Sequence, residues 1–202
     1  MKAQAASRRQ SRPPITARPE LLVNGSDRLF RQFVHNSFSF AALHNAIRDH
    51  YAACVGLPGP QYTILQCIRY LAADGAVNVR DVAEELHLSG SFVTIETNKL
   101  EKAGLISKKR DGRDRRAVSL VVTARGNTLI DSIAPIRRKV SAVQFACLSA
   151  ENFRILAPLL KDLVPCGERA LSLLQFMREH GEVPAPVGGR GRNRAAGEAA
   201  RS

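Results

Sequence analysis

The sequence predicts a mainly α-helical chain with one small β-hairpin, of the α+β fold class. Three observations predict it. Residues 78–104 hold two short helical patterns joined by a turn of about four residues. Residues 105–122 change to a period of 2, and long helical apolar stripes flank both segments. Two helices followed by a hairpin form a winged helix-turn-helix, and the flanking helices are predicted to form a separate dimerisation region.

The elements before the motif are two helices. Leu29, Phe33 and Phe40 recur at helical spacing and predict a first helix from Asp27 to Cys54, buried so broadly that it needs more than one neighbour. The run 57–60 contains two prolines and breaks the chain. A second helix is then predicted over 61–73, because proline fits the first turn of a helix.

The two motif helices carry terminal signals. Asn78 is an N-cap with Asp81 in the first turn, and this helix is predicted to stop near His87. Serines at 89 and 91 can cap a second helix over 92–103, and Gly104 ends it because glycine accepts a positive φ. Strands are predicted over 105–110 and 117–122.

Two further helices are expected after the hairpin. Thr123 is the N-cap of a long helix to about Ala146, which Pro135 should kink. Ser149 caps a last helix with a break predicted at 165–167. These helices would expose too much apolar surface in a monomer, which predicts a homodimer.

The predicted segments follow from pattern and composition. They are a disordered basic arm (1–24), a helical dimerisation region (25–56 and 123–178), a winged helix-turn-helix (57–122) and a disordered tail (179–202). The arm and the tail either add salt-sensitive affinity for a polyanion or are only solvated.

The charge balance indicates an anionic partner. The chain has a net charge of +12 and a pI of about 10.3. Residues 1–20 contribute +4 and residues 181–202 contribute +2, which leaves +6 for the segment between them, much of it in the hairpin. A concentrated basic surplus favours nucleic acid. The start of the chain lacks an apolar leader and no run reaches membrane-spanning length, so a soluble cytoplasmic protein without a membrane partner is expected.

The sequence offers little support for an enzyme, a cofactor or a metal. His44 and His50 are six residues apart, the wrong spacing for one helical face, and the sequence contains no phosphate-binding glycine loop or nucleophile elbow. The four cysteines, at 54, 67, 147 and 166, stand singly. They are predicted to be reduced core residues, and a redox-sensing cysteine is the alternative.

The second motif helix and the hairpin are the predicted DNA-contacting surface. Val93, Thr97, Leu100 and Ala103 are expected to face the core. The opposite face offers hydroxyls, an amide and an apolar side chain to base edges, and the basic hairpin suits phosphates or the minor groove. The predicted contacts are Ser89, Ser91, Thr94, Ile95, Asn98, Lys99, Lys102, Lys109, Arg110, Arg113, Arg115 and Arg116. Asp114 is expected to shape the hairpin through Arg116.

The ordered motifs resemble the MarR family of bacterial transcriptional regulators. They are Ser91-x-Val93-Thr94, the run 100–106 (LEKAGLI), Asp114-Arg115-Arg116 and Leu120-x-x-Thr123-x-x-Gly126. The resemblance covers roughly residues 27–175 and implies a homodimeric repressor released by a small ligand or by oxidation. The chain departs from the family pattern at Ile95, where arginine is frequent, and at Glu96, where an apolar residue is frequent.

The resemblance also implies a ligand site between the dimer helices and the winged helix. The candidates are Phe38, His44, Tyr62, Gln66 and Arg69. An aromatic or acyl acid, or its thioester, is the expected effector. The competing hypothesis is a basic DNA-binding or scaffolding protein that recognises no particular sequence.

Overall fold

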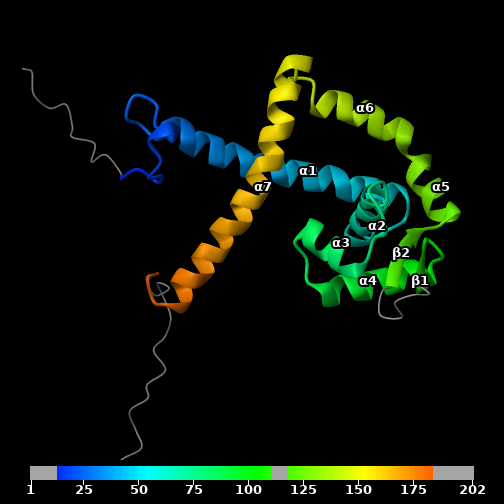
Figure 1. Cartoon of the computed structure of the whole chain (residues 1–202). Helices are drawn as coiled ribbons and strands as arrows, with labels where there is room; N and C mark the ends of the chain where they lie inside the picture. Colours follow the sequence, from blue (N-terminus) through cyan, green and yellow to red (C-terminus); the bar gives the residue numbers. More distant parts are fainter. Residues whose placement is uncertain (1–12, 111–117, 184–202) are drawn as a thin grey trace, which may run out of the picture. The chain divides into compact units, whose positions relative to one another are not determined.

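The computed structural model describes residues 13–110 and 118–183 (Figure 1). The chain divides into two units, residues 1–140 and 141–202, which are described separately below. The elements in order are a 3-10 helix (Pro19–Leu21), α1 (Arg28–Cys54), α2 (Gly59–Leu71), α3 (Val79–Leu86), α4 (Gly90–Lys102), β1 (Ile106–Arg110), β2 (Val118–Val122), α5 (Ala124–Ser132), α6 (Ala134–Gln144) and α7 (Ala150–Glu179). The predicted fold class, mainly helical with a two-stranded antiparallel hairpin, is confirmed.

The core of the first unit lies where α2, α3, α4 and the hairpin meet (Figure 1). In each helix its members lie on the face that turns inward, and in each strand they lie on the side that faces the helices. The fully buried ones are Ile64, Leu65, Ile68, Val82, Val93, Leu100, Ile106, Leu120 and Ile130. Burial of each such side chain is worth about 1.5–3 kcal/mol, and together they fix α4 against α2 and the hairpin.

The predicted terminal signals of the motif helices are confirmed. Asn78 forms a capping box, with its side chain accepting from the backbone of Arg80 and Asp81 while the Asp81 carboxylate accepts from the Asn78 backbone. His87 ends α3 with a φ of +52°. α4 begins two residues earlier than predicted, because Ser89 is the N-cap and accepts from the Phe92 backbone at 3.3 Å.

The junction between α4, β1 and α5 depends on two hydrogen bonds of Thr123 and on the small size of Gly126. The Thr123 hydroxyl donates to the Gly104 carbonyl at 2.7 Å and accepts from the Gly126 backbone at 3.0 Å. A Cβ on Gly126 would overlap with the Leu105 carbonyl oxygen and lie 2.8 Å from Val122 Cγ1. The hairpin gains a third paired segment, because the Leu120 backbone donates to the Val77 carbonyl at 2.7 Å.

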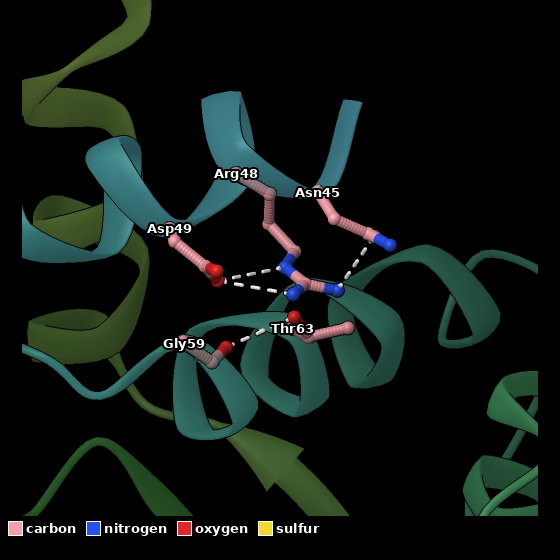
Figure 2. A network of polar contacts seen from close by, with 5 residues as sticks. All are labelled: Asn45, Arg48, Asp49, Gly59 and Thr63. Atoms are coloured by element: carbon pink, nitrogen blue, oxygen red, sulfur yellow. Dashed lines mark hydrogen bonds and ion pairs between the residues drawn. The ribbon is translucent and has the colours of Figure 1, made fainter. Parts of the chain in front are cut away.

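Polar side chains at the end of α1 lie beside the start of α2 (Figure 2). Arg48 donates to the carboxylate of Asp49 at 3.0 Å and to the side chain of Asn45 at 3.1 Å. Gly59 permits the close approach, since a Cβ there would overlap with the Asp49 carboxylate. Within α2, Thr63 donates to the Gly59 carbonyl at 2.9 Å. These bonds lie within α1 and within α2, and the close approach of Gly59 to Asp49 lets the two helices pack together.

The structure differs from the predicted disordered arm over residues 13–24. Arg31 of α1 donates to the Pro13 carbonyl at 2.8 Å, and the Ile15 backbone donates to Asp27 at 2.8 Å. Arg31 also pairs with the Asp27 carboxylate at 2.9 Å, and this hydrogen bond is the main reason that the pKa of Asp27 is lowered. Composition identified the Arg, Ser and Pro content but not these bonds to α1. The remaining part of the predicted arm, residues 1–12, lies outside the described residues.

The helices after the hairpin also differ from the prediction. The single kinked helix is two helices, because the break falls at Ile133 and Pro135 then lies in the first turn of α6, where proline costs no hydrogen bond. The predicted break at 165–167 was wrong: α7 runs through both Pro158 and Pro165. An internal proline removes one donor, which a 30-residue helix can accommodate by bending.

α7 is the main element of the second unit. The Ser149 side chain caps it, as predicted, by accepting from the Asn152 backbone at 3.1 Å. All residues of α7 are at least partly exposed in the single chain. Its large exposed apolar side chains include Phe153, Leu156, Leu159, Leu160, Leu163, Val164, Leu171, Leu174 and Phe176. Apolar surface of this extent is unusual on a monomer.

Candidate nucleic-acid interface

The outward face of α4 carries a continuous stripe of exposed side chains. Its members follow one another at spacings of 3 or 4 residues and therefore share one face of the helix. They are Ser91, Thr94, Ile95, Asn98 and Lys102, and all five are exposed. Ile95 is 53% exposed although it is apolar. On the opposite face Val93, Thr97 and Leu100 are buried as predicted, whereas the prediction for Ala103 was wrong, because Ala103 lies at the C-cap and is exposed.

The hydroxyl groups at the start of α4 are held by local bonds. Ser89 lies at the N-cap, and its Oγ is 3.2 Å from that of Ser91. Thr94 donates its proton to the Gly90 carbonyl at 2.8 Å. A hydroxyl whose proton is already donated still offers lone pairs and, for threonine, a methyl group. Thr94 is therefore suited to accept a hydrogen bond or to contact a thymine methyl.

The first strand of the hairpin is tied to α4 through Lys108. Its ammonium donates to the Asn98 side-chain oxygen and lies 3.7 Å from Glu101 Oε2. The Lys108 backbone also donates to Glu101 Oε1 at 3.3 Å. Lys108 was absent from the predicted contacts. The alternation of side chains along the strand could have identified it, because it puts Lys108 on the same face as the buried Ile106.

Glu96, whose partner the sequence left open, is the buried acid of the site. Its side chain is 9% exposed, accepts from Gln61 of α2 at 3.0 Å and pairs with Lys99 at 2.7 Å. The hydrogen bond from the Lys99 ammonium is the main reason that the pKa of Glu96 is lowered. The Glu96 carboxylate thus partly neutralises the charge of Lys99, which was predicted to contact a phosphate. The bond from Gln61 to Glu96 anchors α4 to α2.

Several predicted contacts fall on the tip of the hairpin. Residues 111–117, and with them Arg113, Asp114, Arg115 and Arg116, lie outside the described residues, as does the side chain of Arg110. Lys109 is exposed on β1. The roles predicted for the tip, including the shaping of the wing by Asp114 and Arg116, therefore stay predictions.

Comparison with known proteins agrees with this geometry. A family model described as the MarR family matches residues 55–117, which include the whole helix-turn-helix and the first strand. The HTH-type transcriptional repressor MdtR of Bacillus subtilis is 24% identical over 130 residues, covering 64% of this chain and 84% of that protein. The chain belongs to the MarR family.

Solved MarR-family structures share the fold. CouR from Rhodococcus jostii, bound to p-coumaroyl-CoA, superposes with a TM-score of 0.59 at 20% identity, over 68% of this chain and 95% of that one. A mutant MarR from E. coli complexed with operator DNA superposes with a TM-score of 0.54 at 16% identity, over 68% and 95%. These structures show the shared fold. The family match and the named relatives make the chain a DNA-binding transcriptional regulator of the MarR family.

The ligand-site candidates of this MarR-family chain are not gathered in one cavity of the described structure. Tyr62 is buried and accepts from Gln66 at 2.9 Å. Arg69 is bound by Asp131 of α5 at 2.6 Å. Phe38 is 72% exposed on α1, and His44 lies on the same helix stacked on Phe40. Arg69 instead borders a cavity of about 230 Å³ lined by Ala72, Gly75, Ala76, Val77, residues 119–122 and Asn127.

The cysteines correct one prediction. Only Cys67 of the four is buried, and its burial raises the pKa of its thiol to about 11, which disfavours the reactive thiolate. Cys54, Cys147 and Cys166 were predicted to be core residues but are exposed in the single chain. Cys54 and Cys166 lie on uncovered faces of α1 and α7, and Cys147 lies in the turn between α6 and α7. Arg169 donates to the Cys166 sulfur at 3.1 Å.

The described residues contain neither a membrane-spanning helix nor a metal-binding cluster. Over residues 13–110 and 118–183, there is no helix both long and apolar enough to cross a membrane. The same residues contain no group of three His, Cys, Asp or Glu side chains arranged to hold a metal ion.

Proposed function

We propose that the chain is a sequence-specific repressor that binds a palindromic operator as a homodimer and is released by a small ligand. The observation that carries the proposal is the exposed stripe on α4, in which the apolar Ile95 stands beside hydroxyls and an amide. An isoleucine exposed beside hydroxyls, an amide and a basic hairpin can contact a thymine methyl in the major groove. The MdtR relative is named a repressor, which supports the sign of regulation.

The homodimer is supported by uncovered apolar side chains in both units. In the first unit Leu29, Phe33 and Phe38 of α1 are 58%, 55% and 72% exposed. In the second, α7 exposes a long apolar face. A monomer rarely exposes so much contiguous apolar surface. A second copy that covers these faces through a twofold axis presents two α4 helices to inverted half-sites about one helical turn apart.

Release by a small ligand is supported by two neighbouring structures and by the bond between Arg69 and Asp131. One neighbour is bound to p-coumaroyl-CoA and another is regulated by 6-hydroxynicotinic acid. In this chain an acidic ligand in the cavity beside Arg69 would compete with Asp131 for the guanidinium. By binding one arrangement of α2 and α5 better than another, it would shift the population away from the DNA-binding form.

A gel shift tests the proposal. The probe is the DNA upstream of the chain's own gene, titrated with purified protein in excess random DNA and then footprinted. A specific regulator protects a defined, twofold-symmetric segment that survives the competitor. Loss of all binding to the competitor would instead support the alternative, a basic DNA-binding protein without sequence preference. Adding p-coumarate or 6-hydroxynicotinate to the preformed complex then tests release.

A further inference from the structure

We propose that Asn98 and Lys108 together read a guanine in each half-site, a specificity that asparagine alone does not have. The proposal rests on the proposed function, because it assigns a base to one position of the operator. Asn98 lies in the exposed stripe of α4, between Ile95 and Lys102. Lys108 belongs to β1, so the reader is composed of side chains from both parts of the winged helix.

The orientation of the Asn98 amide is fixed by the chemistry of its partner. An ammonium group has three donors and no acceptor, so the Asn98 atom that it contacts is the oxygen. The amide nitrogen, with both of its protons, is then at the other corner of the side chain. The amide of Asn98 therefore presents both of its donor protons to solvent, while one lone pair of its oxygen is bound by the Lys108 ammonium.

Lys108 is itself held in place. Glu101 accepts from its backbone at 3.3 Å and lies 3.7 Å from its ammonium, and the Lys108 side chain is only 20% exposed. Asn98 and Glu101 lie on α4 three residues apart and therefore share one side of the helix. The lysine thus bridges the hairpin to α4 and keeps its positive charge next to the amide before any DNA binds.

The donor pattern selects among bases. An unconstrained asparagine pairs with adenine in the major groove, because its oxygen accepts from adenine N6 while its nitrogen donates to N7. The Lys108 ammonium takes up one lone pair of the Asn98 oxygen and places a positive donor group beside the other, which disfavours the approach of the adenine N6 donor. Guanine offers two acceptors, O6 and N7, which suit the amide protons of Asn98 and a remaining proton of the Lys108 ammonium.

Selection from random duplexes, followed by sequencing, tests the inference on the full-length chain and three variants. Asn98→Ala identifies the operator position that depends on Asn98, because only that position loses its base preference. Lys108→Met frees the amide oxygen and removes one charge. Lys109→Met is the matched control, since it removes the same charge from the adjacent, exposed residue of β1. Circular dichroism checks that each variant is folded.

The expected results differ for each chain. The native protein prefers guanine over adenine at the Asn98-dependent position by about tenfold or more, the usual size of one good base contact. Lys108→Met reverses or abolishes that preference, whereas Lys109→Met weakens binding to all sequences and leaves the guanine preference intact. Adenine at that position in the native site, or guanine retained by Lys108→Met, overturns the inference while the proposed function stands. A native protein that enriches no motif overturns both.

Discussion

Gln61 of α2 donates a hydrogen bond of 3.0 Å to Glu96 of α4, and this bond joins the helix that carries the exposed stripe to the helix that follows α1. The other carboxylate oxygen of Glu96 is bound by Lys99 at 2.7 Å. Glu96 is 7% exposed, so both bonds are needed to keep a charge where solvent is largely excluded. The position of α4 is thus set by a polar contact as well as by its buried apolar face.

Replacing Glu96 by glutamine should destabilise the protein. Glu96→Gln replaces one of the two accepting oxygens by an amide donor, so either Gln61 or Lys99 loses its acceptor at a nearly buried position, at a cost of about 1–3 kcal/mol in the free energy of unfolding. Urea denaturation at pH 7 measures the difference. Glu84→Gln is the matched control, because Glu84 forms a solvent-exposed ion pair with Arg80, and its loss should cost less than about 1 kcal/mol.

The stability lost in Glu96→Gln should depend on pH. The bond from Lys99 holds the pKa of Glu96 below its usual value in the folded state. A lowered pKa means that the carboxylate contributes its full stability above the unfolded pKa of about 4.3, and loses it as the pH falls through the lowered folded value. The difference between native protein and variant should therefore be largest near neutral pH and shrink in acid. A difference that grew as the pH fell would contradict this assignment.

The same variant should bind random DNA with a steeper salt dependence. Once Glu96 is neutral, the Lys99 ammonium is free to neutralise a phosphate. The slope of log K against log salt concentration should then increase by about 0.9. Fluorescence anisotropy on a random duplex over a range of NaCl concentrations measures it. Glu151→Gln, which removes one negative charge from the start of α7, is expected to leave the slope unchanged; an equal change in both variants would refute a local role for Lys99.

Gly126→Ala should weaken the fold although alanine normally favours helices. The added methyl group would overlap with the Leu105 carbonyl oxygen, which is backbone and cannot rotate away. A loss of about 1–3 kcal/mol is expected from the required backbone shift. Gly90→Ala is the control, because a Cβ at Gly90 meets no atom within 4 Å. Thermal unfolding of both variants without DNA distinguishes a steric effect from a general effect of alanine.

Acidic substitutions on the apolar face of α7 should dissociate the homodimer. Leu159 and Leu163 are 55% and 50% exposed in the single chain and lie one helical turn apart. In the proposed dimer both leucines become buried, and each then contributes about 1.5–3 kcal/mol. Replacing both by glutamate should therefore weaken association by about a hundredfold or more. Lys161→Glu changes the net charge by the same amount on the opposite side of α7. Sedimentation velocity measures the state of each; a native chain that stays monomeric contradicts the proposal.

Local chemistry made much of the fold predictable. The caps at Asn78, Thr123 and Ser149 act within a few residues of their own helices, and a single sequence contains everything that they need. The two differences in the helices after the hairpin both involve prolines. A proline pattern does not tell a helix start, as at Pro135, from a tolerated bend, as at Pro165.

The site was predictable only in outline. The spacing of exposed positions along α4 follows from its helical period, which is why the stripe was found. The bonds from Gln61 to Glu96 and from Lys108 to Asn98 join residues 35 and 10 positions apart, and no local pattern reports them. Arg69 was expected to meet a ligand, but its partner Asp131, 62 residues away, becomes visible only in the folded chain.

Site-specific photo-cross-linking to DNA tests the central claim, that the exposed face of α4 enters the groove. A photo-reactive p-benzoylphenylalanine replaces Ile95 in one sample and Ile136 of α6 in the other; the native side chains are 53% and 45% exposed. At protein concentrations that saturate the footprinted duplex, the account predicts cross-linked DNA from position 95 and none from position 136. A position 95 that never cross-links to bound DNA, or that cross-links no better than position 136, would contradict it.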